Sequence, residues 1–169
     1  MCIRDRLDED FVGRQLVDQR LQFAGVVVRR STYEEVGGFS SAFFHCLDWD
    51  MWKRIALRTP IFYDPQPLAC YRLHAAADSS RLLRTGENVA DERRSIDLSA
   101  SAFESADAAR LRREANKAAG VRAARRARLL WKSGQRAAAW RQASEALRCS
   151  LAPAVVARAA YFVVRTVLR

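Results

Sequence analysis

The stretch of residues 31–74 constrains the fold of this chain more than any other part of the sequence. Gly37-Gly38 follows a short helix signal, and an amphipathic run begins at Asp48 with apolar residues at three- and four-residue spacing. An apolar segment at residues 68–73 comes next, and another lies upstream at residues 21–28. This order predicts strand, helix, loop, helix and strand, with polar side chains from separate elements brought close together.

Local signals set the expected ends of the two helices. Ser31 and Glu34 have the spacing of a capping box, so the first helix is expected to begin at Ser31. Gly37-Gly38 ends it about one turn later, because glycine takes the left-handed conformation at little cost. Asp48 and Asp50 suit the start of the next helix, where negative charge is favourable.

Charge is distributed unevenly along the 169 residues. Residues 1–80 carry ten Lys/Arg against eleven Asp/Glu, whereas residues 81–169 carry nineteen against eight, within a total net charge of +10. Such asymmetry between halves indicates two functional parts, with the basic part facing phosphates or an anionic membrane. A solvated, arginine-rich helical surface is the equally weighted alternative.

The first ten residues and the spacing of the cysteines lead us to expect a cytoplasmic protein. The charged first ten residues contain no apolar core of a signal peptide. The four cysteines form neither a C-x-x-C pair nor a zinc spacing, which predicts reduced thiols. The most apolar segment, residues 154–168, is interrupted by Arg158 and Arg165 and is expected to lie at most on the inner face of a membrane.

The second half of the chain is expected to be almost entirely helical, because it is rich in alanine and arginine. Residues 75–87 are small and polar and predict a linker, and Ser133-Gly134 predicts a tight turn within an αα-hairpin. The expected helices lie near residues 87–97, 106–119, 121–132, 135–148 and 154–168. We therefore divide the chain into a first part at residues 1–80, a linker with a short helix at 81–105, and a helical region at 106–169.

Three motifs of the first half together resemble a known enzyme family. The sequences STYEEVGGF, LDWDMWKR and YRLH are similar to the acceptor-side half of the GT-A domain in glycosyltransferase family 2. The resemblance implies an α/β fold, in which a partial, Rossmann-like GT-A half-domain precedes the all-α basic appendage. It further implies a bacterial transferase for cell-envelope polysaccharide, with a nucleotide-sugar donor, a glycan or lipid-linked acceptor, and Mg²⁺ or Mn²⁺.

Asp48 is the catalytic candidate that the resemblance implies. In the family, this aspartate takes a proton from the acceptor hydroxyl during an inverting transfer of the sugar, and a carboxylate within hydrogen-bond reach can do so. Leu47 stands where the family has a glutamate, which leaves the role of the neighbouring acid open. The structural alternative is that Asp48 caps the helix that it begins.

The triplet Asp48-Trp49-Asp50 is not expected to bind a metal. Side chains two residues apart on a helix point about 200° apart, so the two carboxylates cannot converge on one ion. Asp50 is instead expected to hold backbone amides or Arg54, four residues on. Gly37, Gly38, Asp50 and Arg54 are therefore classed as structural.

Further substrate contacts are expected from residues near the same place. Alternation along a strand puts Arg72 and His74 on one face, where arginine could bind a diphosphate and histidine a phosphate or a metal. A structural arginine and a surface histidine are the alternative. Trp49 and Phe39 are candidates for stacking on sugar rings, with Trp49 the expected exposed ring, and Arg30 is a candidate phosphate contact.

The chain contains no pattern for a nucleotide-binding half, so we expect a fragment that is inactive by itself. Two other functions remain open. One is a helical interaction module; the other is a protein that binds anionic membranes or nucleic acid through residues 110–169, which carry fifteen Lys/Arg and two acids. The absence of a reading-helix motif argues against nucleic acid, and residues 154–169 are the expected membrane contact.

Overall fold

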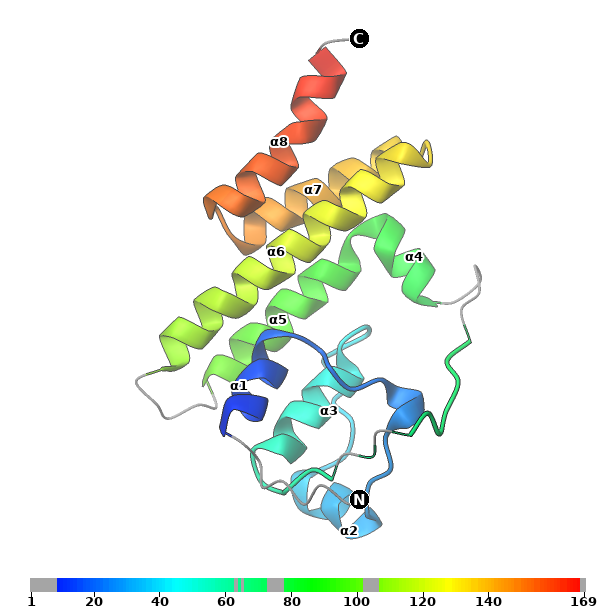
Figure 1. The fold of residues 1–169 in the computed structure, drawn as a ribbon, viewed down its shortest axis with the longest axis vertical. Coiled ribbons are helices and arrows are strands. Elements are labelled where there is room, and N and C mark those ends of the chain that lie inside the picture. Colours follow the sequence, from blue (N-terminus) through cyan, green and yellow to red (C-terminus); the bar gives the residue numbers. More distant parts are fainter. Residues whose placement is uncertain (1–8, 63, 65, 73–77, 102–106, 168–169) are drawn as a thin grey trace.

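The computed structural model describes residues 9–62, 64, 66–72, 78–101 and 107–167, with side chains described in these ranges outside 9–10, 12, 78 and 161–167. These ranges hold eight α-helices and one short 3-10 helix (Figure 1). In chain order they are α1 (Glu9–Val17), η1 (Phe23–Gly25), α2 (Arg30–Val36), α3 (Leu47–Ala56), α4 (Asp78–Thr85), α5 (Glu87–Ser101), α6 (Ala108–Lys132), α7 (Arg136–Cys149) and α8 (Pro153–Val167).

The predicted α/β fold, a partial GT-A half-domain, is wrong, because the described residues contain helices and no strand. The 3-10 helix η1 interrupts the expected strand at residues 21–28, and residues 66–72 have no regular secondary structure. A strand satisfies its backbone groups only through neighbouring strands, and the described parts of the chain supply none. The apolar segments at residues 21–28 and 66–72 therefore form no sheet with other described residues.

The second half of the chain is helical, as the sequence predicts. Two of its helices differ from the predicted ones in where they begin or end. The helices expected at 106–119 and 121–132 are one continuous helix, α6, with Gly120 buried near its centre. Helix α4 lies inside the expected linker of residues 75–87. Gly134 has φ 80° and joins α6 to α7, so the predicted αα-hairpin is confirmed.

Helix α6 is the centre of the molecule. It contacts α5, α7, α8 and α1, and α7 returns antiparallel beside it (Figure 1). Helices α4 and α5 also pack on α7, while α1 and α3 pack together and against α5. The C-terminal end of α8 projects away from the α6–α7 pair in Figure 1. The whole arrangement is thus organised around one long helix.

Alanines on α6 allow this close packing. Three apolar clusters share its buried face, and together they pack residues of α3, α5, α7 and α8 against it. One of them combines residues from both sides of the division predicted at residue 80, which itself stays a prediction. Its buried members are Phe43, Cys46, Trp49, Ile96, Ala115 and Ala119.

The predicted capping box at Ser31 does not form. Helix α2 begins one residue earlier, at Arg30, and its N-cap Arg29 makes no side-chain capping bond. Glu34 accepts a hydrogen bond from Nε of Arg30 at 2.9 Å instead of reaching back to the cap amide. Both side chains of that pair are exposed, so the pair contributes at most about 1 kcal/mol.

Replacement of glycine by alanine is expected to have opposite effects on stability at two helical positions. A Cβ at Gly120 would lie 3.0 Å from the backbone oxygen of Ala146 and 3.1 Å from Val155, so Gly120→Ala is expected to cost about 1–3 kcal/mol of stability. At Gly13 in α1 the nearest atom would be 3.9 Å away, so Gly13→Ala should gain about 0.5–1 kcal/mol from helix propensity. Urea unfolding of both variants measures the two signs, and a loss at Gly13 or a gain at Gly120 contradicts this packing.

Candidate functional site

Asp48 lies in the first turn of α3, and the fold itself uses its carboxylate. One oxygen accepts a hydrogen bond from the Gln19 side-chain amide at 2.8 Å, and the other accepts the backbone amide of Trp49 at 2.7 Å. The side chain is half-buried. Asp48 thus ties the segment after α1 to the start of α3.

Both tryptophans of α3 are buried. Trp49, the expected exposed ring, is 1% exposed, and its indole N–H donates to the backbone oxygen of Gln15 at 2.6 Å. Trp52 is 2% exposed and packs against the rings of Phe23 and Phe39. Trp49 is therefore placed in the core, where it cannot stack on a ligand at the surface.

Arg54 binds the end of α2. Its guanidinium donates to the carbonyl oxygens of Val36, Gly37 and Gly38 at 2.8, 2.6 and 2.8 Å, and its Nε donates to Asp50 at 2.9 Å. Gly37 has φ 70°, a conformation that glycine adopts without strain, and it ends the helix. These four predicted residues, Gly37, Gly38, Asp50 and Arg54, form one contact that locks α2 onto α3.

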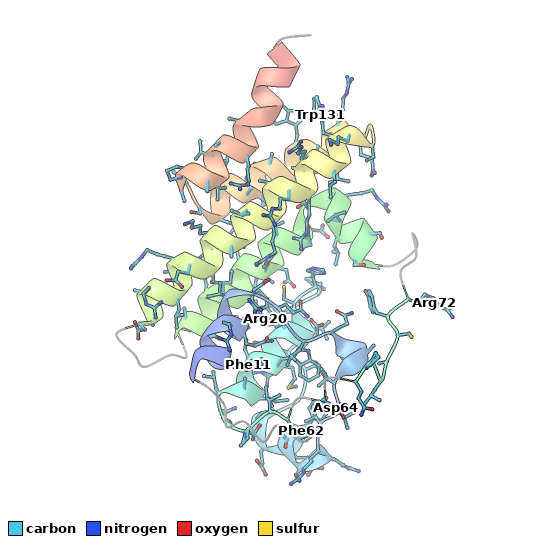
Figure 2. All side chains as sticks on the ribbon, viewed as in Figure 1. Phe11, Arg20, Phe62, Asp64, Arg72 and Trp131 are labelled. Atoms are coloured by element: carbon cyan, nitrogen blue, oxygen red, sulfur yellow. The ribbon has the colours of Figure 1, made fainter. Side chains whose placement is uncertain are left out.

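Of the predicted substrate-binding residues that the structure describes, Arg30 and Arg72 lie exposed on separate segments. Arg72 is exposed on an irregular segment at the outer edge of the molecule, well away from α3 in Figure 2. Arg30 is exposed on α2, and Phe39 is 42% exposed among aromatic rings. His74 lies outside the described residues.

A divalent metal has no ligand set in the described ranges. No group of three His, Cys, Asp or Glu side chains there is placed to hold an ion. Asp48 and Asp50 are each occupied by other partners, so they do not fit Mg²⁺ or Mn²⁺, and we derive no chemistry through a metal.

Asp91, which no sequence pattern singled out, organises the loop before α3. One carboxylate oxygen of this α5 residue accepts the consecutive backbone amides of Phe44, His45 and Cys46 at 3.1, 2.8 and 2.9 Å. The residue is 5% exposed. These three amides lie 45–47 positions away, so no local pattern could have identified this contact.

Lys53 is buried between α3 and α5. Its ammonium donates to the backbone oxygen and the hydroxyl of Ser95 at 3.0 and 2.6 Å and lies 4.2 Å from the centroid of the Trp49 ring. Burial lowers the pKa of Lys53 to about 8, against the opposing effect of Cys46, Asp50 and Glu92. Burial also raises the pKa of Cys46 and lowers that of His45, where Arg126 acts in the same direction.

A salt-bridge network joins α5, α6 and the segment after α1. Glu92, itself buried, binds Arg122 and also lies 3.5 Å from Arg126. Arg122 reaches Asp18 at 2.8 Å. Nearer the start of α6, Arg112 pairs with Asp97 at 2.7 Å. Arg122 and Arg126 are thus engaged within the fold, whereas Arg112 forms a solvent-exposed pair.

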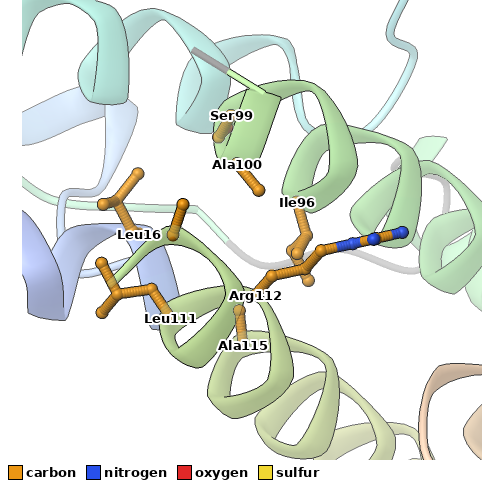
Figure 3. A pocket seen from close by; sticks show the side chains of 8 residues that line it. Leu16, Ile96, Ser99, Ala100, Leu111, Arg112 and Ala115 are labelled. Carbon is orange, nitrogen blue, oxygen red and sulfur yellow. The ribbon is translucent and has the colours of Figure 1, made fainter. Parts of the chain in front are cut away.

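A small apolar cavity lies between α1, α5 and α6 (Figure 3). Its volume is about 10 Å³, and Leu16, Ile96 and Leu111 are among its lining residues. A space of this size holds at most about one water molecule, and its apolar lining disfavours even that. The cavity is therefore a packing defect and cannot accept a substrate.

The outward surface of α7 is the remaining candidate site. Four residues at three- and four-residue spacing on one side of this helix are exposed: the apolar Ala137, Trp140 and Leu147, and the small polar Ser144. Trp140 is 42% exposed and Leu147 38%. Three exposed arginines, Arg136, Arg141 and Arg148, flank them. We call these seven residues the α7 face. Leu151, just after the helix, is 75% exposed and extends the apolar line.

A comparison with known proteins finds a short similarity to a mycobacterial protein. The chain is 33% identical over 69 residues to "Uncharacterized protein MT1568" of Mycobacterium tuberculosis (strain CDC 1551 / Oshkosh), a match that covers 41% of this chain and 22% of that protein. The chain thus spans only about a fifth of the relative. No protein-family model matches the chain, and no solved structure matches it.

These findings correct the functional prediction from the first half. The described residues are helical and no family model matches, so the identification as a GT-A glycosyltransferase of family 2, and with it the prediction of a transferase enzyme, is wrong. The similarity between the motifs is local: STYEEVGGF and LDWDMWKR lie on α2 and α3, where their polar residues make structural contacts. The helical architecture of the described residues is compatible with the other expectation, a helical module.

Asp91 and Asp97 on α5 give a matched test of buried and exposed carboxylates. Asp91→Ala leaves three backbone amides without their acceptor and is expected to cost about 2–4 kcal/mol of stability. Asp97→Ala removes only a solvent-exposed pair with Arg112 and should cost no more than about 1 kcal/mol. Chemical unfolding of both variants gives the comparison, and equal losses would show that Asp91 does not hold the loop.

The buried Lys53 predicts a rise in stability with pH. Its pKa of about 8 in the folded state lies below the ordinary value of 10.5, so between these values the unfolded chain binds more protons and alkali favours folding, by about 1–3 kcal/mol in total. Lys53→Met should remove this rise. Raised thiol pKa values at Cys46 and Cys149 act oppositely but are present in both proteins. Urea unfolding from pH 7.5 to 10 measures the difference, and parallel curves exclude the lysine.

Proposed function

We propose that this helical module docks on the surface of anionic membranes through the α7 face. The observation that carries the proposal is the combination, on one exposed helix side, of apolar and cationic side chains. A helix with this composition lies in the plane of a bilayer interface, with apolar groups among the acyl chains and arginines at the phosphates. The proposal moves the expected membrane contact from residues 154–169 to residues 136–151.

The apolar part of the α7 face has the chemistry of an interfacial anchor. A tryptophan with an exposed ring places its apolar body in the headgroup region and keeps its N–H in a polar environment. Trp140 and Leu147 are seven residues apart, or about two helical turns, so they lie on the same side of α7. Ser144 between them is small, and its hydroxyl suits the headgroup region, where polar partners are present. Leu151 follows directly and adds a third large apolar group.

The charged part favours an anionic surface. The acidic residue of α7, Glu145, is buried, and it is neutralised by Arg93 at 3.0 Å and Arg148 at 2.6 Å. Arg136 and Arg141 are exposed beside the apolar line. Each arginine near an anionic bilayer contributes about 1 kcal/mol of attraction. Salt is expected to weaken the interaction, since exposed charges are screened.

Nucleic acid suits the same surface less well. Sequence-tolerant binding of single strands uses several aromatic platforms along a basic groove, and readout of duplex bases uses amides or arginines directed at base edges. The α7 face offers one exposed tryptophan, and the other members of its line are alanine, serine and leucine.

In the described residues no helix is both long and apolar enough to cross a bilayer. The proposed contact is at the membrane surface.

The experiment compares two double variants that remove equal charge from different helices. Arg136→Gln/Arg141→Gln should weaken binding to phosphatidylcholine vesicles containing phosphatidylglycerol about 10–30-fold at low salt, since each arginine contributes about 1 kcal/mol. Arg113→Gln/Lys117→Gln removes two exposed cations from α6 and should change binding less than about threefold. Co-sedimentation with the vesicles measures both affinities, with pure phosphatidylcholine vesicles as the uncharged reference.

A second pair of variants tests the apolar contribution. Trp140→Ala should weaken vesicle binding about fivefold, because the ring is about half available for burial in the interface. Leu129→Ala, at a 66% exposed position of α6, is the matched control and should have no effect. Equal losses from the α6 and α7 double variants, or tighter binding to an oligonucleotide than to the vesicles, would refute the proposal.

A further inference from the structure

The C-terminal end of α4 is fixed against α7, beside the α7 face. The side-chain amide of Gln142 donates to the backbone oxygen of Leu83 at 2.7 Å, and the guanidinium of Arg141 donates to that of Arg84 at 3.5 Å. Both oxygens belong to the last turn of α4, where carbonyl groups lack partners within the helix. Side chains of α7 thus bind the end of α4 and place the backbone of Arg84 next to Arg141.

The turn between α4 and α5 brings the two backbones equally close. Gly86 has φ 84°, a conformation that glycine adopts without strain, and it joins the two helices. A Cβ at this position would lie 3.6 Å from the Cβ of Arg141 and 3.4 Å from the Cγ of Glu145. We call the place where Arg84 and Gly86 meet α7 the α4–α7 junction. Its backbone is held by packing and hydrogen bonds, so the position of Arg84 beside the α7 face is set by the fold.

The junction carries more positive than negative charge. The acidic residue of α7, Glu145, already binds Arg93 and Arg148. Arg84 and Arg141 are both exposed, and among the described residues neither forms an ion pair with a carboxylate. Two neighbouring cations without such a partner repel each other, and an anion bound between them relieves the repulsion. The charge of the junction therefore favours an anionic ligand.

We propose that Arg84 and Arg141 together bind the phosphate of an anionic lipid headgroup at the α4–α7 junction. This inference rests on the membrane docking proposed for the α7 face, and it extends the contact to a second helix. Arginine suits such a ligand because its planar guanidinium donates two parallel hydrogen bonds to phosphate oxygens. Long, flexible side chains from two adjoining backbones can both reach one phosphate placed at the junction.

A lipid suits the junction better than free phosphate does. Trp140 precedes Arg141 in the sequence and is 42% exposed, and Leu147 lies two helical turns farther along the same side of α7. The acyl chains of a bound lipid would contact these apolar groups while its phosphate stays with the arginines. Free phosphate gains only the charge attraction, which salt screens.

Two arginines of α4 give a matched test in the full chain. Arg81 lies one turn before Arg84 and is already paired with Glu87 at 3.3 Å, so it is the control. Arg84→Gln should weaken binding to phosphatidylcholine vesicles containing phosphatidylglycerol about fivefold at low salt, as expected for one arginine at an anionic bilayer. Arg81→Gln changes the net charge equally and should weaken binding less than about twofold. Co-sedimentation measures both affinities.

The conservative variant separates charge from a structural role of the arginine. Arg84→Lys keeps the positive charge and should bind the vesicles within about threefold of the parent. The replaced side chains at positions 81 and 84 are exposed, so all three variants should unfold at the same urea concentration as the parent. Binding by Arg84→Lys that is as weak as binding by Arg84→Gln would overturn the assignment of phosphate attraction to this position.

A soluble lipid separates headgroup binding from general attraction to a charged surface. Dihexanoyl phosphatidylglycerol, used below the concentration at which it forms micelles, should shift the NMR signals of the backbone amides of residues 84–86 and 141. Inorganic phosphate at the same concentration should shift them less. Equal shifts with phosphate indicate an adventitious ion only and overturn the inference, as does the absence of shifts with the lipid.

The vesicle data distinguish failure of this inference from failure of the docking proposal. Binding of the parent that Trp140→Ala weakens supports docking through the α7 face. If Arg84→Gln then weakens binding no more than Arg81→Gln does, the headgroup site at the junction is overturned and docking through the α7 face stands. A parent chain that does not bind the vesicles overturns both.

Discussion

The close packing of small residues along α6 is the constraint on which the remaining fold depends. Helices with large side chains at their contacts keep their axes about 8–10 Å apart, and small residues allow the closest approaches. Helix α6 presents such residues toward α5, α7 and α8, and a Cβ added at Gly120 would meet a backbone oxygen at 3.0 Å. Its buried small residues are Ala115, Ala119, Gly120, Ala123, Ala124 and Ala127.

Buried polar groups then fix how the N-terminal helices sit on this frame. Asp91 holds the loop before α3, Lys53 binds Ser95, and Glu92 lies between two arginines. A buried charge is costly unless it has partners, so these contacts specify one arrangement of α3, α5 and α6. Among the side chains that looked chemically promising in the sequence, Asp48, Asp50 and Arg54 are likewise used within the fold. The surface proposed for membrane contact is the α7 face.

The sequence could have predicted the α7 face only in part. The seven-residue spacing of Trp140 and Leu147 defines one side of a helix, but α7 also has an apolar side with Ala139 and Ala143. Periodicity alone does not tell which side faces inward. The packing of α7 on α6 decides it, since Ala139 and Ala143 lie in one apolar cluster with Leu130 of α6. The strand tendency of residues 26–28 was readable from the valines, whereas the lack of a strand beside them among the described residues was not.

The sequence alone determined the helical character of the second half, the turn at Gly134 and the end of α2 at Gly37. Each depends on propensity or on a backbone conformation that glycine permits, and helices satisfy their hydrogen bonds within one segment. Only the tertiary structure decided that the apolar segments at 21–28 and 68–72 are not strands. It also decided which groups the acids on α3 and α5 bind. A strand needs a neighbouring strand, and a carboxylate such as Asp91 acquires its role from backbone amides at least 45 residues away.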